Sequence, residues 1–183
     1  MAKTKILLIQ TAFLGDLLLS VPLIKSLRAR LPQSEISLVS RKGVGSLLKD
    51  LGLVDRDYEI QNKNRKSYQD VVTALQGTQF EYILAPHESF TSALLARKIS
   101  AKTKIGFFNW WNFLFFDERI KKNLQLPDAL RQMSLLKNHW PELSQNLQTF
   151  QKAETMAREN GRLSAVPDWA SPLVDVSSHQ RGV

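Results

Sequence analysis

The chain has 183 residues, 43% of them hydrophobic and 23% charged, a composition that suits one globular domain with a modest appendage. The absence of cysteine excludes a disulfide framework, a thiolate metal site and a cysteine nucleophile, and the three scattered histidines form no metal-binding pattern. The net charge of +8 favours either a solvated basic surface or an anionic ligand such as a nucleic acid, an acidic lipid or a phosphorylated sugar.

Targeting and membrane-spanning patterns are not evident. The apolar run at residues 6–9 is too short for a secretory signal. No stretch approaches the roughly 18 apolar residues of a membrane span. We therefore expect a soluble or peripheral protein of the cytoplasm.

Short apolar runs alternate with helical patterns over the first 107 residues. The expected strands are 6–10, 35–40, 57–60, 80–84 and 103–107. After a first helix that ends at Leu31, the expected helices are 44–51, 67–75 and 89–99. This alternation predicts an α/β fold, a Rossmann-like doubly wound parallel sheet with all its strand-to-helix loops on one edge.

The first helix contains a proline, Pro22, which is unfavourable in a helix interior. Pro22 is tolerated in a first turn, which Ser20 would cap, or at a kink.

The strand–helix pattern ends after Gly106. Residues 127–140 and 141–160 look helical, and the proline- and serine-rich stretch from 161 looks like a linker. We expect one domain at 1–140 and a helical, linker-like tail at 141–183.

Seven of the sixteen aromatic residues lie between Phe107 and Phe116. This cluster is too dense for an average surface loop. Three interpretations remain: domain core, contact with another domain or subunit, and a membrane-surface anchor supported by the lysines and arginine that follow.

The loop at 11–16 places Asp16 at the carboxyl end of the first strand, where open α/β sheets bind ligands. The loop has one glycine and matches neither the dinucleotide fingerprint nor a phosphate loop. Spacing alone favours Asp16 as a helix cap. A carboxylate at this position would also serve as a general base toward a sugar hydroxyl.

A second polar segment, 85–92, follows the fourth strand and contains His87, Glu88, Ser89 and Thr91. One interpretation is local: Ser89 caps its helix and the other polar side chains are solvated. The other is a polar wall for a sugar or phosphate ligand. No nucleophile-elbow pattern surrounds Ser89.

Together these segments resemble the N-terminal domain of the ADP-heptose:lipopolysaccharide heptosyltransferase family. The resemblance covers about residues 4–140 and is carried by the apolar strand, the Gly-Asp loop with its downstream proline, and the later strand–helix unit, at 6–9, 14–23, 27–32, 80–96 and 101–107.

The resemblance implies an inverting, metal-independent glycosyltransferase of the GT-B fold that uses no cofactor and transfers heptose from ADP-heptose to the lipopolysaccharide inner core. Asp16 matches the proposed catalytic base. The acceptor would be bound by residues of the two loops, namely Thr11, Ala12, Phe13, Leu14, Gly15, His87, Ser89 and Thr91. The implied location is cytoplasmic, peripheral at the inner face of the inner membrane.

The family's donor-binding domain is not recognisable in this sequence. The chain would then supply half of a cleft, completed by a separate donor-domain chain, or be inactive alone. The alternative is a non-catalytic Rossmann-like module for an anionic partner. Nucleic acid is not expected, because no element interleaves basic and aromatic residues as a binding platform would.

Overall fold

The structure is a computed structural model that describes residues 3–140. Residues 1–135 form one compact unit and 136–183 a second, of which only 136–140 are described. The helix expected at 141–160 and the linker after it lie outside the described residues. The division at residue 140 therefore stays a prediction.

Among the described residues, six parallel strands form one sheet in the order β3-β2-β1-β4-β5-β6. The strands are β1 Lys5–Gln10, β2 Glu35–Arg41, β3 Arg56–Ile60, β4 Phe80–Ala85, β5 Ala101–Phe107 and β6 Glu118–Ile120. All five predicted strands are confirmed. The strand order reverses between β1 and β4, so the loops after these two strands flank the topological switch point, where sheets of this kind bind ligands.

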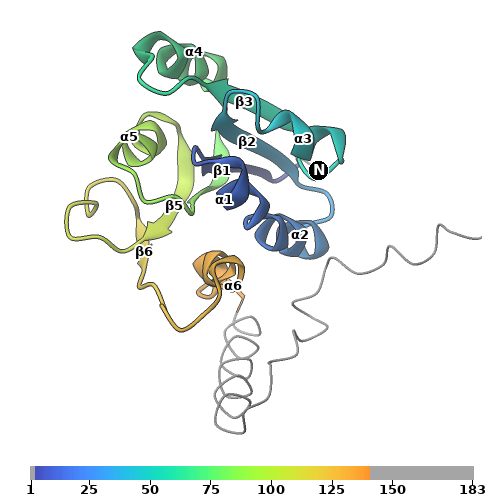
Figure 1. Cartoon of the computed structure of the whole chain (residues 1–183), viewed down its shortest axis with the longest axis vertical. Helices are drawn as coiled ribbons and strands as arrows, with labels where there is room; N and C mark the ends of the chain where they lie inside the picture. Colours follow the sequence, from blue (N-terminus) through green and yellow to red (C-terminus); the bar gives the residue numbers. More distant parts are fainter. Residues whose placement is uncertain (1–2, 141–183) are drawn as a thin grey trace, which may run out of the picture. The chain divides into compact units, whose positions relative to one another are not determined.

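Helices cover both faces of this sheet (Figure 1). They are α1 Leu14–Leu18, α2 Val21–Arg30, α3 Ser46–Asp50, α4 Arg65–Leu75, α5 Phe90–Lys98 and α6 Asp128–Met133, the last followed by a 3₁₀ turn at Ser134–Leu136. Helix α2 packs against α6, and α4 packs against α5. The doubly wound, Rossmann-like arrangement is confirmed.

The core explains why β1 is continuously apolar. Leu7 and Ile9 belong to a buried cluster that also contains Val71 of α4 and Leu95 of α5. Leu8, which alternates with them and therefore points to the opposite face, is also fully buried. A strand covered on both faces selects apolar residues at every position.

The first helix differs from its prediction. It is split into α1 and α2, and Pro22 lies in the first turn of α2 as expected. Ser20 holds the N-cap position of α2, but its side chain accepts no capping hydrogen bond. The Ser20 hydroxyl instead donates to Oε1 of Gln132 (2.6 Å), and it also lies 3.3 Å from the carbonyl oxygen of Asp16. Tertiary contact has replaced the local cap.

The aromatic segment forms the connection between β5 and β6, a strand that the sequence did not reveal. Phe107 and Phe116 are buried, and Trp111 and Phe115 pack against the core cluster. This connection covers part of the sheet face next to α5. Its sequence has no helical period, so the pattern gave no sign of this packing. The core interpretation of the cluster is thus correct for these four residues. Phe108, Trp110, Phe113 and Leu114 of the segment are exposed.

The expected helix at 127–140 is also shorter than predicted, because α6 ends at Met133. The Ser134 hydroxyl donates to the carbonyl of Arg131 at 2.6 Å. Such side-chain bonds compete with the backbone ladder and favour an early end.

Gly106 gives a stability prediction. A Cβ at this position would lie 2.8–2.9 Å from three ring carbons of Phe116, which is itself buried. We expect Gly106→Ala to lower the free energy of unfolding by about 1–3 kcal/mol through overpacking. Urea unfolding measures this. Gly15→Ala is the control, because no atom lies within 4 Å of its added methyl and the helix gains propensity. Equal stability of the two variants would contradict the packing.

Candidate functional site

Three cavities follow one another near the carboxyl edge of the sheet. The first, the polar hollow, has a volume of about 270 Å³. It is lined by residues from the segments after β1 and β4, by Lys122 after β6 and by residues of α6. Its charged lining alternates in sign: Asp16, Glu88 and Asp128 face Lys122 and Arg131. Lys122 Nζ pairs with Glu88 at 2.5 Å, and Arg131 pairs with Asp128.

The second cavity, the first-loop hollow, has a volume of about 250 Å³. Its walls come from the carboxyl ends of four strands, with Thr11, Ala12 and Phe13 after β1, Arg41 at the end of β2, Asn62 after β3, and His87, Ser89 and Thr91 after β4. The Arg41 guanidinium lies 4.4 Å from the centre of the Phe13 ring. This contact holds the exposed Phe13 side chain at the cavity that both residues line.

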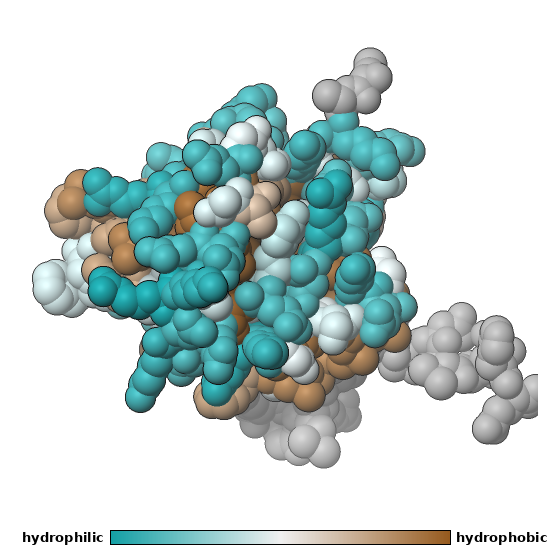
Figure 2. Space-filling model, turned by 90° about the horizontal axis from the view of Figure 1, so that it is seen from above, coloured by the Kyte–Doolittle hydropathy of each residue, from teal (hydrophilic) through white to brown (hydrophobic). Residues whose placement is uncertain are grey.

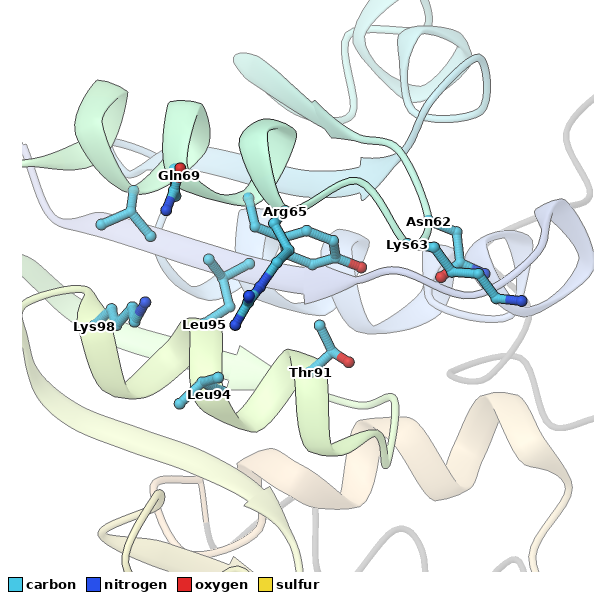
Figure 3. A pocket seen from close by; sticks show the side chains of 10 residues that line it. Asn62, Lys63, Arg65, Gln69, Thr91, Leu94, Leu95 and Lys98 are labelled. Carbon is cyan, nitrogen blue, oxygen red and sulfur yellow. The ribbon is translucent and has the colours of Figure 1, made fainter.

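The third cavity, the helix groove, is the largest at about 450 Å³ and lies between α4 and α5 (Figure 3). Lys63, Arg65 and Lys98 are its charged residues, and no carboxylate lines it. Its apolar floor includes Leu94 and Leu95, below the extended side chain of Arg65 (Figure 3). The groove thus combines an apolar surface with positive charge.

Local sequence shapes the turn at one end of this groove. Lys63 adopts a left-handed backbone conformation with φ of 62°. Asn64 then caps α4, its side-chain oxygen accepting from the backbone N–H groups of Lys66 (3.1 Å) and Ser67 (3.4 Å). The cap fixes the start of α4, and with it the position from which Arg65 extends.

Shared residues join the three cavities. Asn62, Tyr68 and Thr91 line both the helix groove and the first-loop hollow. Asp16 and His87 line both the first-loop hollow and the polar hollow. A ligand that runs along this edge would therefore pass between the side chains of Asp16 and His87.

Asp16 is exposed and lies in the first turn of α1. The capping hypothesis for this residue is wrong, because Phe13 occupies the N-cap position and no side chain caps the helix. Within residues 3–140 the carboxylate has no hydrogen-bond or ion-pair partner. Its two oxygens are therefore available to a ligand.

His87 is partly buried beside it. Burial lowers the pKa of His87 below its usual value. The negative charge of Asp16 opposes this effect, and the positive charge of Lys122 reinforces it. The imidazole is therefore neutral at pH 7, with one nitrogen to donate and one to accept. That state suits a hydrogen bond to a sugar hydroxyl.

This direction gives a pH prediction. The unfolded chain takes up a proton at His87 near pH 6.5, whereas the folded chain resists it, so the contribution of this residue to stability falls as pH drops below about 6.5. We expect the thermal midpoint of the wild type to fall between pH 7.5 and roughly pH 5.5, and that of His87→Asn to fall less. Melting curves across this range measure it. A steeper fall in the variant would contradict the direction.

A chain of hydroxyls connects the first loop to α5. Thr11 Oγ1 lies 2.9 Å from Ser92 Oγ, and Ser89 Oγ donates to Ser92 Oγ at 2.8 Å. Ser89 also caps α5, accepting from the Ser92 backbone N–H at 3.0 Å, so its predicted capping role is confirmed. These bonds hold the two predicted loops against each other.

A second hydrogen-bond network, which is buried, holds the backbone of Asp16. Gln10 donates to Ser20 Oγ at 3.0 Å and Ser20 donates to Gln132 at 2.6 Å, so β1, α2 and α6 meet at one hydroxyl. Ser20 and Gln10 also approach the carbonyl of Asp16 at 3.3 and 3.4 Å. The backbone that carries the carboxylate is therefore tied to the core of the domain.

The structure brings together most of the residues that the sequence proposed. Thr11, Ala12, Phe13, Asp16, His87, Ser89 and Thr91 line the first-loop hollow. Leu14 and Gly15 line none of the three cavities.

Sequence reasoning missed several lining residues. Arg41 is the last residue of β2 and Asn62 follows β3, so the rule that selected Asp16 and His87 could have found them. Lys122 follows β6, a strand with no sequence signal, and Gln132 depends on how α6 docks.

The sequence matches no protein-family model and no curated protein. Solved structures do match. E. coli heptosyltransferase WaaC with ADP has a TM-score of 0.66 and 17% identity over 75% of this chain and 48% of that chain. The glycosyl transferase family 9 protein from Veillonella parvula DSM 2008 has a TM-score of 0.66 and 18% identity over 75% of this chain and 42% of that chain.

The chain has the fold of these glycosyltransferases. It spans about half the length of each of them. E. coli WaaC with ADP-2-deoxy-2-fluoro heptose matches equally well, with a TM-score of 0.66. The expected fold class is thus confirmed, and these neighbours are consistent with the heptosyltransferase resemblance.

Over residues 3–140 there is no helix with the length and apolar character needed to cross a membrane. In the same residues no group of three or more histidine, aspartate or glutamate side chains is placed to hold a metal ion.

Proposed function

We propose that this chain is the acceptor-binding half of an inverting glycosyltransferase of the heptosyltransferase family. Asp16 carries the proposal, because its carboxylate has no protein partner within residues 3–140 and lies where two cavities meet at the switch point of the sheet. In the proposed reaction heptose passes from ADP-heptose to the lipopolysaccharide inner core.

The proposed chemistry is general base catalysis. As the acceptor oxygen forms its bond to the anomeric carbon of the donor sugar, the Asp16 carboxylate takes the hydroxyl proton. The bond from that carbon to the diphosphate breaks on the opposite side, and the nucleoside diphosphate leaves. Neutral His87, facing the same cavities, would hold the acceptor hydroxyl toward Asp16. The donor and its diphosphate would be bound by a second domain or a separate donor-domain chain.

The acceptor has a natural path in this proposal. Lipopolysaccharide core sugars are acidic and phosphorylated, and the helix groove offers Lys63, Arg65 and Lys98 without an opposing carboxylate. A bound acceptor would extend from these cations through the first-loop hollow to Asp16. The location that follows is the inner face of the inner membrane, where the lipid-linked acceptor lies.

Acceptor binding by the purified chain tests this proposal. Titration with a deacylated, phosphorylated core saccharide should show binding that weakens with salt. We expect K63Q/R65Q to weaken it about tenfold, roughly 0.7 kcal/mol per charge. The matched control is K3Q/K49Q, which removes two exposed lysines near the opposite edge of the sheet. Unchanged binding by K63Q/R65Q, or an equal loss in the control, would contradict this acceptor path.

The second candidate is a non-catalytic module for an anionic partner. The carboxylate-free helix groove favours it, since binding alone requires only that groove. Activity separates the two: a module without catalysis would bind the saccharide but support no transfer when joined to a donor-binding domain.

A further inference from the structure

The connection between β5 and β6 leaves part of its aromatic cluster exposed. Trp110 is 82% exposed and Leu114 62%, and Phe108, Phe113 and Phe90 of α5 are exposed as well. We call these five residues the aromatic surface. Figure 1 shows the connection projecting from the side of the sheet beyond α5, away from α1. Figure 2 shows apolar side chains gathered at this margin of the molecule.

This surface is held in place by the chain beneath it. The Asn112 side chain donates to the carbonyl of Phe107 at 2.7 Å and accepts from the backbone N–H of Asn109 at 3.1 Å. Phe90 packs on Trp111 and Phe115, with ring centres 5.7 and 5.6 Å apart. The exposed rings therefore stand on a fixed base, and their exposure is a property of the fold.

Positive charge surrounds the aromatic surface. The Arg119 guanidinium lies 5.5 Å from the Phe108 ring centre, and that of Arg97 lies 5.8 Å from the Phe115 ring centre. The Phe108 N–H donates to the Ile120 carbonyl at 2.8 Å, so the backbone of Lys121, the next residue, lies beside that of Phe108. Over residues 97–122 the sequence has seven lysines and arginines against two acidic residues.

These features together select one kind of partner. Exposed tryptophan, phenylalanine and leucine insert at the boundary between headgroups and acyl chains, while arginine and lysine around them attract anionic lipid. Within residues 3–140, Arg97, Arg119 and Lys121 form no ion pair, so their charge is available. We propose that the aromatic surface docks this domain on a membrane that contains anionic phospholipid.

The proposal deepens the proposed function, on which it rests for the expectation of a lipid-linked acceptor. The aromatic surface lies on the flank next to α5, and the carboxylate of Asp16 lies at the switch point. Docking through the flank would hold the domain at the bilayer while the helix groove and the first-loop hollow stay accessible to the acceptor.

Vesicle co-sedimentation of the full chain tests the proposal. We expect binding to phosphatidylcholine vesicles that contain phosphatidylglycerol, and weaker binding to phosphatidylcholine alone or at high salt. W110S/L114S should bind the mixed vesicles about tenfold or more weakly. R119Q/K121Q should lose only the preference for phosphatidylglycerol. L47S/L51S, which alters two exposed leucines near the β3 side of the sheet, is the matched control.

Four outcomes would overturn the proposal. They are no binding of the wild type to either vesicle, undiminished binding by W110S/L114S, an equal loss in L47S/L51S, and a wild-type dimer that W110S/L114S dissociates, which would identify a second copy as the partner. Light scattering reports the last outcome, and circular dichroism verifies that the variants are folded.

The two proposals fail separately. Binding of the deacylated saccharide needs no membrane, so W110S/L114S should retain it even if vesicle binding is lost. D16N should in turn retain vesicle binding. If the wild-type chain bound the vesicles but not the saccharide, the proposed function alone would be overturned.

Discussion

Asp16→Asn is expected to lower the rate of glycosyl transfer by a factor of about 10²–10⁴ when the chain is joined to a donor-binding domain. Asparagine preserves the shape of the side chain and its place between the two hollows, but it does not accept the proton of the acceptor hydroxyl. The rate of nucleoside diphosphate release in the presence of the acceptor measures the effect.

The expected loss is confined to catalysis. Acceptor affinity of Asp16→Asn should stay within a few-fold of the wild type, because the helix groove supplies the charge that attracts the acceptor. Asp50→Asn is the control, since Asp50 is an exposed carboxylate at the end of α3 that lines none of the three cavities. Transfer by Asp16→Asn at the rate of this control would contradict the assignment of Asp16 as the base.

Leu8→Ala is expected to lower the free energy of unfolding by about 2–5 kcal/mol. Leu8 is fully buried in β1, paired with Leu38 of β2 and Leu84 of β4 in the middle of the sheet. Removing its side chain leaves a cavity that strands fixed on both sides do not easily close. Urea unfolding measures the change.

Leu51→Ala provides the comparison for Leu8→Ala. Leu51 is an exposed leucine at the end of α3, and its truncation should change stability by about 0.5 kcal/mol or less. If the two leucine variants unfolded at the same urea concentration, β1 would not be the centre of the core.

The fold was predictable where one local pattern dominates. The strands β1, β2 and β4 are largely apolar and bounded by turns. Helices α3 and α4 end close to the predicted residues 51 and 75, and each is followed by a glycine with positive φ, Gly52 and Gly77. The strand β6 has three residues and no helix before it, so neither length nor period marked it. Its place depends on the aromatic connection, whose packing is tertiary.

The candidate site was predictable to the extent that it follows strand ends. Asp16 and His87 lie in the segments that follow β1 and β4, and parallel topology places these segments at one edge. The role of Ser20 was not predictable, because its partner Gln132 lies 112 residues away and a hydroxyl near a helix start is usually a cap. The helix groove was missed for the same reason, since Arg65 and Lys98 are distant in sequence.

Chemical-shift mapping tests the central claim most directly, that this chain binds the acceptor saccharide along the edge that carries Asp16. The labelled chain is titrated with the deacylated, phosphorylated core saccharide and, separately, with ADP-heptose. We predict that the saccharide shifts the backbone amides of residues 11–16, 62–65 and 87–91, and that ADP-heptose shifts them far less. Saccharide shifts confined to the opposite edge of the sheet, or larger shifts with ADP-heptose, would contradict the account.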